Sequence, residues 1–561
     1  MLFELCLLAL NRAPVPPRKT EIAFHRDDAR ADTRNGSRTA EQVEVIARRW
    51  LYDLQVAPLL PDELTYERKR TAMQEHASDS KRASIRNARG ELREANEFGR
   101  HGLDHDETRC NNARIIASQS GRSQSTMCEA MISRAGQGAI MAGRRDGRNM
   151  ARAKGIKEVA YVDVGHGGGV RPDRAAQGAG LQSMTWFDCA GGGQVVVDKG
   201  VAYIGNMHNP HGTLMVDVSD PKRPKQLASI SMPAGTHSHK VRVCDGIMVT
   251  NREILRAQVA QGEVPPEGYH GGISIYDVSN PARPKLITNW NTTDEPGPSY
   301  ARGVHRFDFD GRYAYISPTW DGFIGNIMMI LDLKDPARPQ EVGRWWMPGQ
   351  WVGGGEKPTW ERDAHKCHHP LRHGNRLYTS YWHGGFVILD IDDMTKPRFI
   401  SGLDWSPPFP WPTHTVLRIP FKISNRDFLL VTDEDVFRME HFPKYPASFL
   451  WMVDITDEQH PQPISTFQVE DMPDTPQPRM TGCHQPCEKV TGTEIPVAWF
   501  AHGLRIIDIS RPHALKEVAY YLPDVPQGSD RVQSNDVTVD DRGLIYLLDR
   551  VRGLHILERI G

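Results

Sequence analysis

The stretch Leu214-Met-Val-Asp-Val-Ser-Asp-Pro-Lys-Arg-Pro-Lys225 decides the fold, because the chain repeats it. Close copies occupy residues 274–285 and 329–340, and each runs from an apolar strand through Asp-Pro or Asn-Pro and Arg-Pro into another strand. The repeated Asp recurs, with weaker copies included, at positions 217, 277, 332, 390, 454 and 508, in steps of 60, 55, 58, 64 and 54 residues. A β-only repeat of this length predicts a β-propeller.

The two ends of the repeat region indicate how the ring closes. Residues 156–162 (Ile-Lys-Glu-Val-Ala-Tyr-Val) match residues 515–521, which form the outermost strand of a blade, yet no strands of their own precede them. Residues 553–558 match 503–508, after which the chain stops. We therefore predict an all-β, seven-bladed β-propeller over residues 151–561, in which the first strand completes the last blade and removes an open edge.

Residues 1–150 differ from the rest of the chain in composition. They are rich in Arg, Asp, Glu and Ser and poor in Val, Ile and aromatic residues. Such a segment cannot bury enough apolar surface to offset chain entropy. We expect a largely disordered extension, or a start site placed too far upstream.

Composition limits the possible partners. The chain has 561 residues, with 68 basic and 70 acidic side chains and a net charge of −2, so nucleic acid is not an expected partner. No apolar run approaches the roughly 18 residues of a membrane span, so no membrane partner is expected. The eight Cys are scattered, which favours free thiols and a cytoplasmic protein, with the periplasm as the alternative.

The first residues of the innermost strands are polar in every blade. Counted back from the turn glycines, these positions are Gln194, His239, His305, His368, His414, His484 and Asn535. In a propeller such residues converge on the axis at one end. Imidazoles gathered there repel one another when protonated and jointly bind a metal when neutral. We predict that these five His hold one transition metal ion.

Two points about this predicted ring stay open. His369 can replace His368, because insertions blur the alignment of that blade. Nitrogen ligands suit Fe, Cu and Zn alike, so the sequence does not name the metal. The competing interpretation is a water-filled centre lined by hydrogen-bonded His without any metal.

A second group of polar residues lies where the second strands are expected to end, on the same face as the ring. It comprises His208, His211, Glu253, Trp320, Asp321, Trp382, His383, Glu434, Asp435, His502, Asp549 and Arg550. Carboxylates, His and Arg act as acids, bases or oxyanion partners. We predict that His383, Asp435, His502 and Arg550 are the catalytic residues. The alternatives are that these residues orient the ring His, or lie on the surface.

Two long loops on the same face are rich in Trp and Pro, namely residues 345–360 and 405–411. Stiff aromatic loops above a polar centre favour a pocket for a small apolar or aromatic molecule. The alternative is that they only cover the ends of the blades.

These motifs resemble a known family. The strands Leu214-Met-Val-Asp-Val and Val387-Ile-Leu-Asp-Ile, with Gly343-Arg-Trp-Trp-Met-Pro-Gly and Pro412-Thr-His-Thr, resemble the LVIVD-repeat β-propeller proteins. This resemblance implies the fold over about residues 150–561 and no general activity. A more distant likeness, in architecture and His ring alone, is to selenium-binding proteins of the methanethiol oxidase type, which are propellers with a bound metal.

Three functions follow as hypotheses. The first is a metal-dependent enzyme, preferably an oxidoreductase, acting on a small apolar or aromatic molecule. The preference for oxidation rests on the selenium-binding likeness. The second is a metal-dependent hydrolase or lyase using the same site, and the third is a non-catalytic, protein-binding scaffold. A scaffold has no need for five matched His, which disfavours the third.

Overall fold

The computed structural model describes residues 152–164, 191–207, 211–254, 268–292, 303–360, 365–435, 447–470, 480–525, 531–551 and 553–561. Within these ranges there is no α-helix, and one 3-10 turn spans Val352–Gly354. Consequently no helix among these residues is long and apolar enough to cross a bilayer. The extension predicted over residues 1–150 lies outside the described residues.

The strands form antiparallel meanders that follow one another along the chain. The first meander is formed by β3 (Gly192–Asp198), β4 (Val201–Asn206), β5 (His211–Asp217) and β6 (Lys225–Ser231). In the second, β7 (Thr236–His237) and β8 (Val241–Cys244) both pair with β9 (Ile247–Ile254), and β10 (Gly272–Asp277) and β11 (Lys285–Asn291) follow. The third is formed by β12 (Val304–Phe309), β13 (Tyr313–Pro318), β14 (Met328–Asp332) and β15 (Gln340–Trp345).

The next two meanders share one eight-stranded sheet, joined by the single pair Trp382–Thr413. They are β16 (His365–His373), β17 (Arg376–Trp382), β18 (Phe386–Asp390) and β19 (Arg398–Leu403), then β20 (Thr413–Arg418), β21 (Phe428–Asp433), β22 (Leu450–Asp454) and β23 (Gln462–Phe467). The last strands are β24 (Gln485–Pro486), β25 (Glu494–Ala498), β26 (Leu504–Asp508) and β27 (Lys516–Leu522), then β28 (Ser534–Val539), β29 (Ile545–Asp549) and β30 (Gly553–Arg559).

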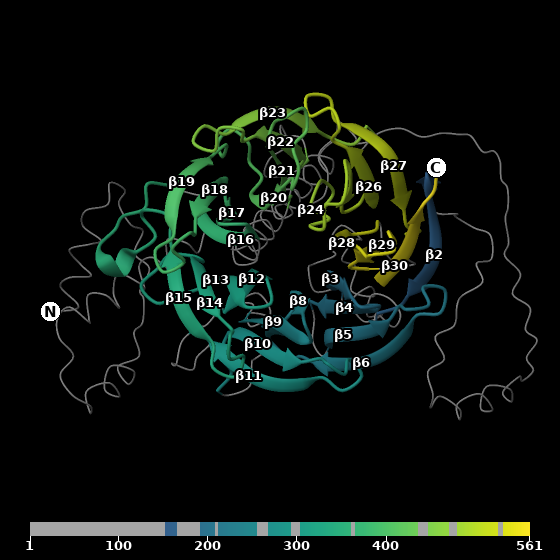
Figure 1. The fold of residues 1–561 in the computed structure, drawn as a ribbon, viewed down its shortest axis with the longest axis horizontal. Helices are drawn as coiled ribbons and strands as arrows, with labels where there is room; N and C mark the ends of the chain where they lie inside the picture. The colour runs from purple at the N-terminus through teal and green to yellow at the C-terminus, as the bar shows by residue number, and fades with distance from the viewer. Residues whose placement is uncertain are drawn as a thin grey trace, which may run out of the picture. The chain divides into compact units, whose positions relative to one another are not determined.

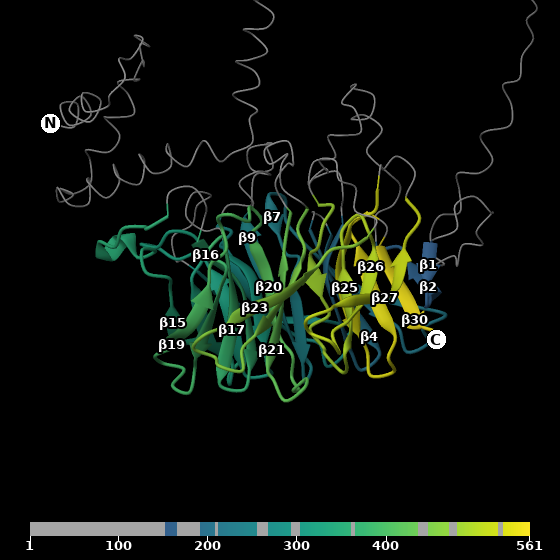
Figure 2. The same ribbon diagram turned by 90° about the horizontal axis from the view of Figure 1, so that it is seen from above.

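The meanders are arranged in a ring, with β3, β12, β16, β20 and β28 towards the centre and later strands outside (Figure 1). Seen from the side, the strands run roughly along the axis of this ring (Figure 2). The predicted all-β propeller is confirmed. The count of seven blades stays a prediction, because the sheets themselves do not separate into seven.

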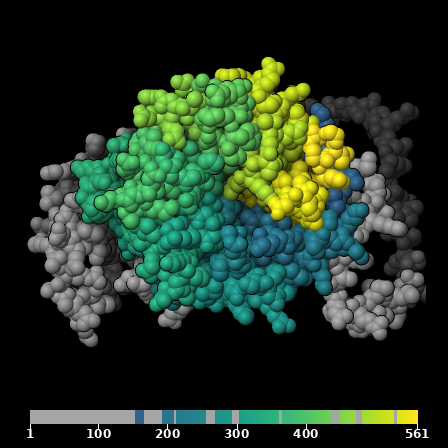
Figure 3. Space-filling view, viewed as in Figure 1, coloured from purple at the N-terminus to yellow at the C-terminus, as the bar shows by residue number. Residues whose placement is uncertain are grey.

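The predicted closure is confirmed. Strand β2 (Ile156–Val162) pairs antiparallel with β30, from Ile156 opposite Arg559 to Val162 opposite Leu554. Figure 3 shows the C-terminal residues in yellow against earlier strands in blue. The sequence did not predict β1 (Arg152–Lys154), which adds a further strand beside β27. Strands β1 and β2 thus add to two different sheets, those of β27 and β30.

The repeated Asp residues cap the turns, as their sequence context predicts. The Oδ1 atom of Asp217 accepts a hydrogen bond from the backbone N–H of Ser219 at 2.9 Å, and Asp508 does the same for Ser510 at 2.8 Å. Three residues after Asp217, Asp220 accepts a hydrogen bond from the backbone N–H of Lys222 at 3.1 Å. These side chains imitate a backbone turn, which is why Asp and Asn recur where each third strand ends.

Apolar side chains pack between neighbouring sheets, so the closing strand contributes to stability. Ile156 is 5% exposed and packs with Ile545 and Leu557. We expect Ile156→Val to lower the free energy of unfolding by about 1 kcal/mol, because it removes one buried methyl group. Urea titration measures this. The control is Lys157→Ala, whose side chain is 62% exposed and which should change stability by less than about 0.5 kcal/mol.

Candidate metal centre

The five predicted ring His come together at the inner ends of successive meanders. Ring centroids are 5.1 Å apart for His239 and His305, 5.0 Å for His305 and His368, 4.5 Å for His368 and His414, and 4.1 Å for His414 and His484. The remaining ring positions, Gln194 and Asn535, are also buried. The imidazoles thus form a continuous arc, and their role as metal ligands stays a prediction.

Irregular pairing near the ring residues brings further side chains to the centre. The register between inner and second strand shifts between Val304 and Phe307, between Thr413 and Thr415, and between Ser534 and Asp536. A β-bulge inserts one extra residue and re-aims the side chains beside it. This allows consecutive residues, such as His305 and Arg306, both to contribute to the polar centre.

The outer nitrogen of several imidazoles is held by the protein. Nδ1 of His368 lies 2.9 Å from the backbone oxygen of His414, and Nδ1 of His484 lies 2.5 Å from that of Asn535. A carbonyl oxygen only accepts, so Nδ1 carries the hydrogen in both rings. In the neutral imidazole, Nε2 then keeps its lone pair. Metal-binding His side chains are oriented in this way.

The ring His are suited to being neutral. Burial, followed by neighbouring imidazoles and cations, holds the pKa of His239, His368 and His414 well below its usual value. Burial also lowers the pKa of His484 to about 4, although Glu434 acts in the opposite direction. These residues therefore offer lone pairs rather than charges at neutral pH.

Two carboxylates join the arc, and both lie among the residues predicted at the second-strand ends. Oε2 of Glu253 lies 2.9 Å from Nδ1 of His305. Oε1 of Glu434 lies 3.2 Å from Nε2 of His484, and its Oε2 lies 3.9 Å from Nε2 of His414. Because Nδ1 of His484 already carries a hydrogen, a second proton or a metal ion must separate Nε2 from the carboxylate.

These donors form two groups that can hold a metal ion. One group is His237, His239 and Glu253, and the other is His368, His414 and Glu434. In each group one ligand atom per residue lies within 4.8 Å of the others, and all six residues are buried. His237 was missed in the sequence, although the pattern His-Ser-His in an extended segment places both imidazoles on one side.

That the five His bind a single ion stays a prediction, and the structure adds carboxylates to the possible donors. Each group of close donors contains two His and one Glu, and the five predicted His divide between the groups or flank them. Alignment of the inner strands located the imidazoles, but it did not show how far the second-strand carboxylates reach inward. Two His and one carboxylate form a donor set that suits non-haem Fe(II) and Zn(II).

Among the predicted catalytic residues, Arg550 lies closest to these groups. Its Nη2 is 4.0 Å from Oε1 of Glu434, and its Nε donates to Oδ1 of Asn535 at 2.7 Å. Burial alone would raise the pKa of Glu434, but His484, Arg550 and Lys240 outweigh burial and lower it. Arg550 therefore helps to keep the Glu434 carboxylate ionised.

The other three predicted catalytic residues lie outside both donor groups. Asp435 accepts from the backbone N–H of Thr481 and Gly482 at 3.1 and 2.9 Å, so it fixes the segment leading to His484. His383 is buried with its ring 6.3 Å from that of Trp382, and His502 lies in the turn between β25 and β26. Catalysis by these three stays a prediction.

The rest of the predicted second group is dispersed. His211 and Asp321 are exposed, Trp320 stacks on Trp290 with centroids 6.0 Å apart, and Asp549 accepts from the backbone N–H of Gln533 at 2.9 Å. Trp382 contacts the ring, with its centroid 4.9 Å from that of His368. His208 lies outside the described residues.

The aromatic loops have two different roles. Trp405 and Trp411 are buried, and Trp405 stacks on Trp451 at 4.5 Å, so residues 405–411 close the end of a blade. Trp351 is 42% exposed beside Phe323 and Trp346. A substrate pocket beneath these loops stays a prediction.

A second polar layer borders the ring, and sequence reasoning missed it. It contains the cations Lys240, Arg242 and Arg306, the carboxyl residues Asp308, Glu488 and Asp536, and the uncharged His369 and Gln485. Arg306 donates to Oε1 of Gln485 at 2.8 Å and to Oε1 of Glu488 at 3.2 Å, while its Nη1 lies 3.2 Å from Nε2 of His414. The ring thus rests on a network with three basic and three acidic side chains.

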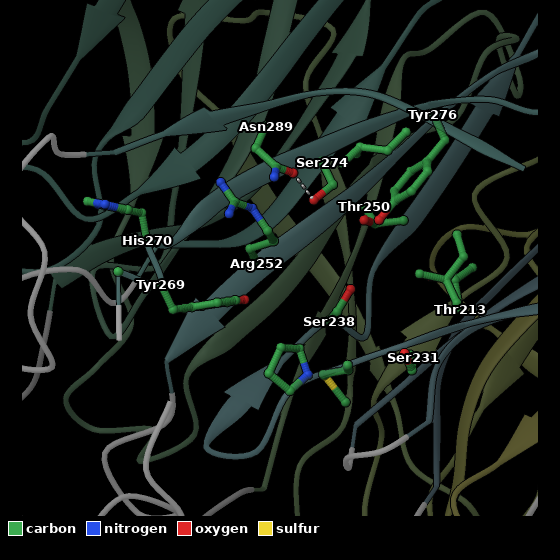
Figure 4. A pocket seen from close by; sticks show the side chains of 16 residues that line it. Thr213, Ser231, Ser238, Thr250, Arg252, Tyr269, His270, Ser274, Tyr276 and Asn289 are labelled. Atoms are coloured by element: carbon green, nitrogen blue, oxygen red, sulfur yellow. Dashed lines mark hydrogen bonds between the residues drawn. The ribbon is translucent and has the colours of Figure 1, made fainter. Parts of the chain in front are cut away.

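A pocket of about 380 Å³ lies between the meanders β3–β6 and β8–β11 (Figure 4). Its polar lining includes Ser238, Thr250, Arg252 and Ser274, and Ser274 donates to Oδ1 of Asn289 at 2.7 Å. Ser238 lies between His237 and His239 in the segment that follows β7, and Arg252 precedes Glu253 in β9. Alternate residues of a strand face opposite sides, so this pocket is separated from the metal groups by backbone.

Fold and site together define a β-propeller protein with a His/Glu centre that can bind metal. The sequence signature of the LVIVD repeat matches residues 269–292, 373–404 and 495–522. The chain thus carries LVIVD repeats, which confirms the predicted resemblance. No curated protein sequence matches the chain.

Solved structures with a similar fold are remote in sequence. A periplasmic gluconolactonase from Pseudomonas aeruginosa is 12% identical, with a TM-score of 0.40 over 60% of this chain and 86% of its own. A putative 6-phosphogluconolactonase from Bacteroides uniformis is 11% identical, with a TM-score of 0.39 over 58% and 83%. The WD40 repeats of RRP9 are 9% identical, with a TM-score of 0.40 over 64% and 87%.

Proposed function

We propose that this protein is a metal-dependent β-propeller enzyme that acts on a small apolar or aromatic molecule, with oxidation as the favoured reaction. The observation that carries the proposal is the orientation of His368 and His484. Their Nδ1–H groups are held by backbone carbonyls, which leaves the Nε2 lone pairs to the donor arc. A hydrogen-bonded His lining without metal has no need for this arrangement beside Glu434.

A bound ion would activate water or dioxygen, or polarise a substrate oxygen. The chain's own residues orient and protect that site. Burial keeps His368 and His414 neutral, Asn535 fixes both His484 and Arg550, and Arg550 supplies a positive charge close to Glu434. Arg550 is therefore the candidate for holding negative charge that develops on the substrate.

The preference for oxidation over hydrolysis rests on the architectural likeness to selenium-binding proteins alone. Two His and one carboxylate serve both Fe(II) oxygenases and Zn(II) hydrolases, so the metal and the need for oxygen decide between them. Hydrolysis or elimination at the same site is the second candidate function.

Metal loading and oxygen dependence test the proposal. Purified full-length protein, loaded separately with Fe(II) and Zn(II), is expected to retain at least one equivalent after gel filtration. It is then given small thiols, phenols and aryl esters in air and under nitrogen, and turnover of a thiol or phenol is expected only in air. Equal turnover without oxygen would leave the hydrolase, and less than about a tenth of an equivalent of metal would refute both.

Loss of metal in a variant separates the centre from adventitious binding. We expect His414→Ala to weaken metal binding more than about tenfold, because changes to ligands and their partners have effects of this size. The matched control is His513→Ala, which changes an exposed imidazole outside the arc. Equal affinity in the two variants would contradict the proposed site.

A further inference from the structure

We propose that the ring holds two metal ions, one at His237, His239 and Glu253 and the other at His368, His414 and Glu434. This inference rests on the proposed metal-dependent function and extends it from one ion to two. Each group is complete in itself, with two imidazoles and one carboxylate whose ligand atoms lie within 4.8 Å. No residue belongs to both groups, so the two sites do not compete for ligands.

In the first group, as in the second, a backbone carbonyl orients one of the imidazoles. Nδ1 of His237 lies 2.9 Å from the backbone oxygen of Met207, so Nδ1 carries the hydrogen and Nε2 keeps the lone pair. The centroids of the His237 and His239 rings are 3.9 Å apart. His239 is 3% exposed, and its Nδ1 is buried without a hydrogen-bond partner among the described residues. A buried polar atom without a partner needs an explanation, and a bound ion is one that fits this position.

The carboxylate of the first group is held in place from outside. Oε2 of Glu253 accepts a hydrogen bond from Nδ1 of His305 at 2.9 Å, which orients the carboxylate. Glu253 is 9% exposed and lies among the imidazoles of His237, His239 and His305. A divalent ion would bind this carboxylate and give the buried Nδ1 of His239 a partner at the same time.

His305 stands between the two groups. Its ring lies 5.1 Å from that of His239 and 5.0 Å from that of His368, so an imidazole separates the two sets of donors. We therefore infer two separately filled sites rather than a pair of ions bridged by one carboxylate. Hydrogen bonding of His305 to Glu253 also gives this predicted ligand a positioning role.

Counting bound ions in matched variants tests the inference. Full-length protein is dialysed against Zn(II) and analysed for metal and protein content, without any assay of activity. The unaltered chain is expected to bind one more ion than Glu253→Gln and one more than Glu434→Gln, and the double variant should lose two. The control is Glu494→Gln, whose side chain is 46% exposed and should leave the count unchanged. His237→Gln replaces Glu253→Gln if the latter does not fold.

Each result has a clear meaning. Independent loss of one ion from each variant supports two sites. The inference is overturned if only the Glu434 variant loses an ion. It is also overturned if each single variant loses one ion and the double variant loses no more than one, because both changes then affect the same ion. In both cases the proposed single-metal enzyme survives. If no variant changes the count, both the inference and the proposed function fail.

Discussion

Replacing Arg306 with alanine is expected to lower the free energy of unfolding by about 3–5 kcal/mol, because it removes one partner from a buried ionic network. Arg306 is 1% exposed and donates to both Gln485 and Glu488. Without it, the Glu488 carboxylate keeps Arg242 as a partner but loses its second cation, and Oε1 of Gln485 loses a donor. Gln485 is 1% exposed, so water does not freely replace the contact that it loses.

The effect is measured by urea unfolding of metal-free protein, so that loss of bound metal does not contribute. Arg312→Ala is the matched control, because Arg312 lies in the turn that follows the strand of Arg306, and it pairs with Asp332 at 2.9 Å while 54% exposed. An exposed pair contributes at most about 1 kcal/mol. Arg306→Ala combined with Glu488→Gln should be less damaging than the sum of the single changes. Equal stability of the two Arg variants would contradict the prediction that the buried network of Arg306 stabilises the fold more than an exposed ion pair does.

The fold was readable from the sequence because its signals are local and repeated. An Asp that caps a turn two residues later needs no distant partner, so Asp217 and Asp508 could be recognised in isolation. The closure could be predicted because residues 156–162 resemble residues 515–521, which were already assigned as the outermost strand of a blade. Strand pairing then follows from the need to cover an open edge.

The candidate site was only partly readable. The inner-strand alignment gave the arc of His, since equivalent positions of a ring converge on its axis. The alignment did not show how far side chains from the neighbouring strands extend towards the axis. In the structure Glu253 and Glu434 reach the imidazoles, whereas Asp435 accepts hydrogen bonds from the backbone. Register shifts added Arg306 and its neighbours, and no pattern in one strand reports a shift against its partner.

His369→Gln is expected to reduce the loss of stability at acid pH. Burial, followed by Arg306 and Arg242, holds the pKa of His369 well below its usual value. In the unfolded chain a His takes up a proton below about pH 6.5, so acid favours the unfolded state. This contribution is absent above pH 7 and grows as the pH falls towards the folded-state pKa. Between pH 7 and pH 5 it amounts to about 2 kcal/mol for one residue.

Buried carboxyl groups act in the opposite direction, so a single pH curve is not decisive. Burial raises the pKa of Asp433 and Asp435 to about 8 and that of Asp536 to about 6, and their stabilising protonation is lost as the pH rises through these values. These carboxyl contributions cancel when the pH dependence of a His variant is compared with that of the unaltered chain. Metal-free His369→Gln should lose about 2 kcal/mol less than the unaltered chain between pH 7 and pH 5. The exposed His513→Gln should follow the unaltered chain. If both variants do so, His369 is protonated in the folded protein, and the ring rests on a more solvated layer than its burial implies.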